Sequence, residues 1–161
     1  MSESCLEKTI ANFEDKILVL ENVRKLNKNL RDNFSDSGAF DEKRYDEIMA
    51  DKSDLIERIA SLNEEADRLY ESFSSEMKTG MIQSEKGMSN LREKIEKLNF
   101  LTKETENDEK EIKNLMERFF SAEREKIKAA HKNSGAAINY YQTMSASKNV
   151  QSMFYDSRSG V

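Results

Sequence analysis

The sequence lacks the residue patterns from which catalytic and metal sites are commonly built. His131 is the only histidine and Cys5 the only cysteine, so the sequence contains neither His-Glu-x-x-His nor Cys-x-x-Cys. A di-iron bundle needs Glu-x-x-His twice, whereas Lys128 stands three residues before the one histidine. Neither Gly80 nor Gly87 leads into the Gly-Lys-Ser/Thr of a phosphate-binding loop. We therefore expect no enzyme activity, no metal site and no cofactor.

Charged side chains of both signs make up 35% of the chain, and the net charge is −5. Acidic residues alternate with Lys and Arg, as they do on solvated helix faces. No basic groove is visible that could neutralise a phosphate backbone, so the composition argues against nucleic acid as a partner.

The last part of the chain, residues 133–161, has a different composition. It carries only three charged side chains, Lys148, Asp156 and Arg158, among many apolar and aromatic ones. A segment of this kind either packs back on the rest of the protein or binds a partner, and the sequence leaves both open. The candidate partner-binding residues are Ile138, Tyr140, Tyr141, Met144, Met153, Phe154 and Tyr155. Met77, Met81 and Met88 are either gap-filling side chains or a second adaptable apolar surface.

The remaining sequence predicts an all-α fold, an antiparallel three-helix bundle with long helices plus a short C-terminal helix and tail. Ser4 and Glu7 have capping-box spacing, and apolar residues then recur at helical intervals up to Phe34. Turn-forming residues follow from Ser35 to Gly38. The apolar positions of this first helix are Ile10, Phe13, Ile17, Leu20, Val23, Leu26, Leu30 and Phe34.

A second helix is predicted from Asp41, a favourable N-cap residue. Its apolar seam has heptad spacing, which indicates a stripe packed against partner helices. The seam consists of Leu55, Ile59, Leu62, Ala66, Leu69 and Phe73. We place a turn between Lys78 and Gly87, because two glycines seven residues apart weaken a helix. The alternative is one continuous helix from Asp41 to Ala130, and hence an extended coiled-coil structural or adaptor protein.

A third helix is predicted from Met88 to Phe119, but its middle is poor in apolar residues. Thr102, Thr105 and Glu109 stand where a core would hold Leu, and further acidic residues crowd the same stretch. We interpret this stretch as a solvated segment that extends beyond a shorter first helix. An acidic patch for a basic partner is the other interpretation.

The resulting division is a helical bundle at residues 1–132 and an amphipathic helix and tail at 133–161. The longest apolar run, Ile17–Leu20, is far shorter than the roughly 20 residues that span a bilayer. The N-terminus has no apolar core of a signal peptide, and one free thiol suits a reducing compartment. We expect a cytoplasmic protein without stable membrane insertion, and a homodimer remains open.

Three stretches together resemble the FlgN/FliT-like flagellar export chaperones, particularly the clostridial members of that family. The first runs along the second predicted helix, and the second is Ala66-Asp-Arg-Leu-Tyr70. The third is the ending, Ala136-Ala-Ile-Asn-Tyr-Tyr141 followed by Ser152-Met-Phe-Tyr-Asp156, and it is the most specific. The residues that carry the first stretch are Phe40, Asp41, Ile48, Lys52, Leu55, Ile56, Ile59 and Leu62.

The resemblance implies a cytoplasmic, non-catalytic helical bundle with protein partners. Its clients would be the terminal helices of a hook-associated or filament-cap protein, which it would keep soluble. It would deliver them to an export-gate protein.

Overall fold

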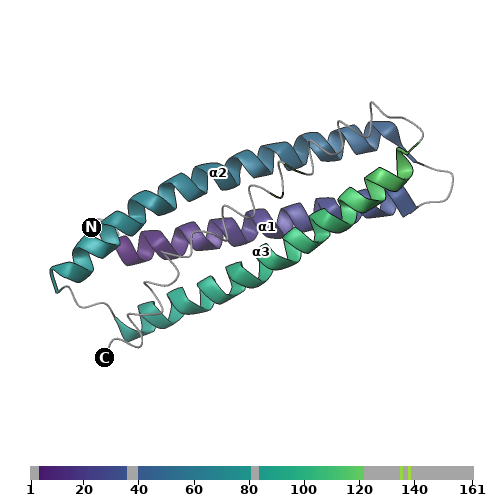
Figure 1. Cartoon of the computed structure of the whole chain (residues 1–161). Coiled ribbons are helices and arrows are strands. Elements are labelled where there is room, and N and C mark those ends of the chain that lie inside the picture. The colour runs from purple at the N-terminus through teal and green to yellow at the C-terminus, as the bar shows by residue number, and fades with distance from the viewer. Residues whose placement is uncertain (1–3, 36–39, 81–83, 122–134, 136–137, 139–161) are drawn as a thin grey trace.

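The computed structural model describes residues 4–35, 40–80, 84–121, 135 and 138, and these residues form helices and their connections, with no strand. Three long helices lie along one another: α1 (Cys5–Ser35), α2 (Glu42–Lys78) and α3 (Glu85–Phe119). Figure 1 shows that they form an elongated bundle. The predicted all-α fold with three long packed helices is confirmed.

Side-chain caps fix the starts of all three helices. Ser4 Oγ accepts the Glu7 N–H at 3.1 Å, and Asp41 Oδ1 accepts the Arg44 N–H at 3.0 Å. Both caps were predicted, since short polar side chains satisfy amide groups that the first turn leaves unpaired. Ser84 caps α3 in the same way through the Gly87 N–H at 3.0 Å, and this cap was not predicted.

The second helix ends at Lys78, as the two glycines indicated. The Thr79 N–H donates to Ser75 O, and the next residue, Gly80, has a φ of +77°. A left-handed residue ends the helix here, which is the usual role of glycine at this position. The alternative of one continuous helix from Asp41 to Ala130 is therefore wrong, and α3 begins separately at Glu85.

The first helix lies between the other two and contacts both. α2 runs antiparallel to α1, and α3 runs parallel to it, so consecutive helices alternate in direction. Contacts along the bundle show these directions. Between α1 and α2, Cys5 contacts Leu69 and Asn12 contacts Leu62. Between α1 and α3, Glu14 contacts Lys94 and Arg31 contacts Glu111.

The apolar side chains of the bundle form two clusters. The large cluster contains the seam of α2, in which Ile59, Leu62 and Phe73 are fully buried. The end cluster lies where α1 and α3 finish and α2 begins, and its buried members are Leu30, Ile48, Ile112, Met116 and Phe120. Half-buried Leu26, Phe34, Phe40, Tyr45 and Met49 pack against it. The predicted seam is confirmed as bundle core.

We expect Gly80→Ala to lower the free energy of unfolding by about 1 kcal/mol, because a Cβ is disfavoured at positive φ. No heavy atom lies within 4 Å of the added methyl group, so backbone strain is the sole cost. Urea unfolding measures the effect. Gly80→Asn is the matched control and should cost less, because Asn tolerates this conformation. Equal stability of both variants and the wild type would contradict the left-handed turn.

Candidate functional site

The middle of α3 is buried, and the expectation of a solvated segment is wrong. Thr105 and Glu109 have no exposed surface, and Thr102 is 3% exposed. The physical reason is that α1 extends to Ser35 and runs parallel to α3, so it covers this stretch along its whole length. Four of the acidic residues here pair with basic side chains of α1 and α2, namely Glu104, Asp108, Glu109 and Glu111.

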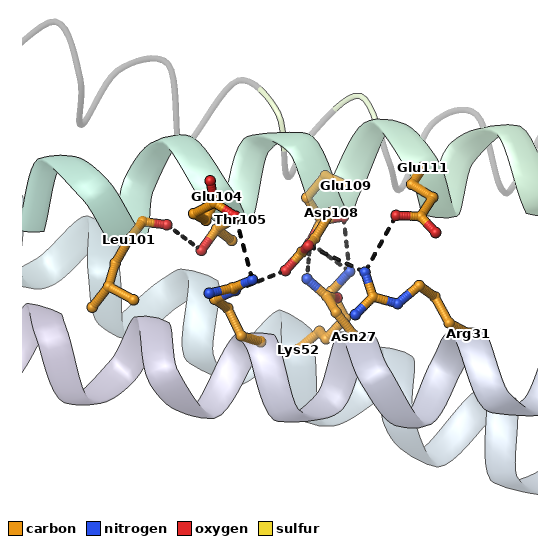
Figure 2. Close-up of polar contacts among 10 residues, drawn as sticks. Asn27, Arg31, Lys52, Leu101, Glu104, Thr105, Asp108, Glu109 and Glu111 are labelled. Atoms are coloured by element: carbon orange, nitrogen blue, oxygen red, sulfur yellow. Dashed lines mark hydrogen bonds and ion pairs between the residues drawn. The ribbon is translucent and has the colours of Figure 1, made fainter.

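One polar side chain from each helix meets in the interior, and we call Asn27, Lys52 and Glu109 the polar layer. Lys52 Nζ lies 2.7 Å from one carboxylate oxygen of Glu109 and 2.8 Å from the other. Asn27 Nδ2 donates to the same carboxylate at 3.2 Å. Figure 2 shows the carboxylate of Glu109 pointing from α3 toward the side chains of the other two helices. All three residues are buried, so the ion pair is shielded from water.

A second set of ion pairs connects α1 to α3 beside the polar layer. Asp108 accepts hydrogen bonds from Arg24 Nε at 3.0 Å and from Arg31 Nη1 at 3.1 Å. Glu104 and Glu111 extend the set, at 3.7 Å from Arg24 and 3.4 Å from Arg31. Asp108 is almost fully buried, whereas Glu104 and Glu111 are partly exposed. The ion pairs of the two glutamates therefore contribute less to stability.

The polar layer lies between the large cluster and the end cluster. A buried ion pair contributes little net stability, because desolvation of both charges offsets their attraction. Loss of one partner is costly, since it leaves a charge in the interior. Any packing of the helices that separates Lys52 from Glu109 carries this cost, so the layer fixes the register of α2 against α3.

Lys16 is a further buried charge, and no carboxylate of the described residues lies within ion-pairing distance of it. The side chain is 2% exposed, and its Nζ lies 5.3 Å from the centre of the Phe13 ring. Burial lowers the pKa of Lys16 to about 8, although Asp67 and Glu65 act in the opposite direction.

Cys5 is the one cysteine, and its thiol is unreactive by position. Its Sγ lies 3.4 Å from the carbonyl oxygen of Leu69, to which it donates a hydrogen bond. Burial, together with the negative charge of Glu76, raises the pKa of the Cys5 thiol. Because the thiolate is the reactive form, this environment suits a packing role.

Five aromatic rings gather at the end cluster, and we call Phe34, Phe40, Tyr45, Phe119 and Phe120 the aromatic end. They come from all three helices and from the connection before α2. The centroids of Phe40 and Phe119 are 4.4 Å apart, and Phe34 contacts the other four. Phe119 remains 43% exposed, so the group presents apolar surface to solvent.

Of the predicted partner-binding residues, only Ile138 is among the described ones. It has helical backbone and is half-buried. Tyr140, Tyr141, Met144, Met153, Phe154 and Tyr155 lie outside the described residues, as do His131 and Met81. Met88 belongs to the large cluster and Met77 is 37% exposed, so these two methionines do not share one surface role.

The sequence analysis did not predict the polar layer, because it considered each of the three residues separately. A signal was present: Lys52 stands three residues before Leu55 and so continues the seam of α2, while Glu109 occupies a core position of α3. Opposite charges at core positions of two helices indicate a buried pair. Asn27 gave no comparable signal.

None of the helices in the described part of the chain is long and apolar enough to cross a membrane. Within the same residues, no group of three acidic, histidine or cysteine side chains is placed to hold a metal ion. Comparison with models of known protein families, with curated proteins and with solved structures finds no match for this chain.

We expect Lys52→Met to lower the free energy of unfolding by about 3–5 kcal/mol, because it leaves the Glu109 carboxylate buried without a cation. The double variant Lys52→Met/Glu109→Leu should recover most of this loss, since it removes both charges. Urea unfolding of both variants measures the effect. Glu111→Gln is the control, because Glu111 is 59% exposed and should change stability by less than about 1 kcal/mol. A small loss in Lys52→Met would contradict a buried pair.

We expect Lys16→Met to raise stability at neutral pH by about 3 kcal/mol, the equivalent of a pKa lowered from 10.5 to about 8. In the wild type, the unfolded chain binds this proton more tightly, so stability rises as the pH increases from about 8 to about 10.5. Thermal unfolding of both proteins across this pH range gives the difference. Cys5 and Tyr45 also have shifted pKa values, but they are present in both proteins. The difference in stability between the wild type and the variant therefore reports on Lys16. A pH-independent difference would show that Lys16 is solvated.

Proposed function

We propose that this protein is a non-catalytic export chaperone of the flagellar type III pathway that acts in the cytoplasm. Its clients are the terminal helices of hook-associated or filament-cap subunits, and it delivers them to a protein of the export gate. Support comes from the resemblance of the second helix and of the ending to this family. The described architecture, a bundle of three long helices, agrees with that resemblance.

The aromatic end is the observation that carries the proposal. A client helix that is not yet assembled exposes an apolar stripe, and such a stripe binds in a groove lined by apolar and aromatic side chains. Phe119 and the half-buried rings beside it provide such a surface. The chain continues from there into the sequence that carries the candidate binding residues.

Affinity capture from a lysate of the cells that make the protein tests the function directly, with mass spectrometry of the bound proteins. Recovery of hook-associated or filament-cap subunits supports the proposal and names the client. Recovery of this chain alone, or of unrelated coiled-coil proteins, contradicts the proposal. It would also show that the resemblance reflects only a shared helical composition.

Removal of residues 134–161 should leave the bundle folded and weaken binding to the captured client by roughly tenfold or more, since these residues carry the candidate apolar anchors. Calorimetry measures the affinity, and circular dichroism checks the helices. Leu18→Ser is the control, because Leu18 is 58% exposed on α1 and lies outside the aromatic end. Unchanged affinity of the truncated protein for the client would show that residues 134–161 do not belong to the binding site.

A further inference from the structure

The two outer helices, α2 and α3, each have α1 as their one close neighbour helix in the described part of the chain. Both pack along α1, whereas their own backbones approach each other at few points. Figure 1 shows α2 and α3 on either side of α1. The sides of these two helices that turn away from α1 therefore have no neighbour helix among the described residues.

α2 nevertheless shields side chains on the side that turns away from α1. Its α1 side is marked by Leu55, which lines a pocket with Leu26 of α1, and by Leu62, whose carbonyl oxygen accepts a hydrogen bond from Asn12. The residues that come one position later lie about 100° around the helix from that side. These residues recur every seven positions and are half-buried: Met49, Ile56, Asn63 and Tyr70.

α3 has a matching column. Its α1 side is marked by Asp108, which pairs with Arg24 and Arg31 of α1. The residues one position later again recur every seven positions, and all of them are buried: Met88, Ile95, Thr102, Glu109 and Met116. We call this column and the column from Met49 to Tyr70 the α2–α3 face.

The α2–α3 face is wider than contact with α1 requires. A helix packed on one partner needs two columns of core residues, and a further column belongs to a helix that contacts two partners, as in a four-helix bundle. Asn63 points the same way, because its Oδ1 is shielded from water and has no hydrogen-bond partner among the described residues. The face therefore has the pattern of a site for one more helix.

The sequence after Ser121 supplies a helix of the right length and pattern. α3 ends beside the start of α2, so a chain that reverses there can run back along both helices. Residues 122–161 number forty, and α2 has 37. Small and apolar residues recur in this segment at steps of three and four, which gives one helical stripe. They are Ile127, Ala130, Ser134, Ala137, Tyr141 and Met144.

Ile138 is the described apolar residue of this segment. It has helical backbone and is half-buried. Ile138 adjoins the stripe, since it follows Ala137 directly and stands one turn after Ser134. Gly135 is also helical, and no heavy atom lies within 4 Å of a Cβ added there. One side of this helix is thus partly covered and another is open, as packing on a single surface requires.

We propose that residues 122–144 form a fourth helix that packs on the α2–α3 face and completes a four-helix bundle. The occupant of the face is this segment of the same chain, and its small residues allow close approach to α2 and α3. The inference does not rest on the proposed function, because the contact is made within one chain whether or not an export client exists.

The reaction of a single thiol with a water-soluble reagent tests the contact in the full chain. Cys5→Ser removes the native thiol, and Ile56→Cys places one on the α2–α3 face. Ile138→Asp should speed the reaction of this thiol roughly tenfold or more, because a buried charge displaces the fourth helix. Asn139→Asp is the matched control, since it adds the same charge about 100° around the helix, and should change the rate by less than about twofold. Equal effects of the two variants, or no effect of either, would overturn the proposal.

Gly135→Ala tests the contact in the opposite direction. Alanine favours a helix more than glycine does, and the added methyl group meets no other atom. The reaction of the thiol at position 56 should therefore slow about threefold. An unchanged rate would show that no helix formed by this segment covers the face. Should Ile138→Asp also speed the reaction of native Cys5, which is buried in the large cluster, the bundle itself has opened and Gly135→Ala decides.

Protein concentration distinguishes the fourth helix from a second copy of the chain. A contact within one chain gives the same rate of thiol reaction at every concentration. A rate that falls as the concentration rises would assign the cover of the α2–α3 face to a second copy and overturn the proposal.

Discussion

The buried pair between Lys52 and Glu109 is the interaction on which the arrangement of this bundle depends. Apolar stripes alone allow two helices to slide by a turn at small cost, since one Leu substitutes for another. A buried cation and a buried carboxylate have only one good partner each. The pair, with Asn27 beside it, therefore sets how α2 and α3 meet across α1, and it divides the core into a large cluster and an end cluster.

The central position of α1 explains the polar side chains that it buries. A helix packed on two sides has little surface left for water, so Asn12, Lys16 and Asn33 are enclosed together with the apolar stripe. Asn12 and Asn33 satisfy the backbone of α2 and of the connection before it. The Nζ of Lys16 lies over the ring of Phe13, and burial lowers the pKa of its ammonium group.

The end cluster differs from the large cluster in size and in exposure. It is the smaller of the two, and the exposed ring of Phe119 packs against its aromatic side chains. It lies on the far side of the polar layer from the large cluster. The polar layer separates the two clusters and binds α3 to its neighbours through Glu109, and Asp108 beside it binds two arginines of α1.

The sequence by itself determined the three helices, the apolar seam and every helix limit except the start of α3, because these follow from local chemistry. Ser4 and Asp41 cap through atoms three residues away, and Gly80 ends α2 through its own backbone. Only the tertiary structure decided that Glu109 is buried, since its partners Lys52 and Asn27 stand 57 and 82 positions away in the sequence. Charge on a helix looks the same in sequence whether water or a buried lysine faces it.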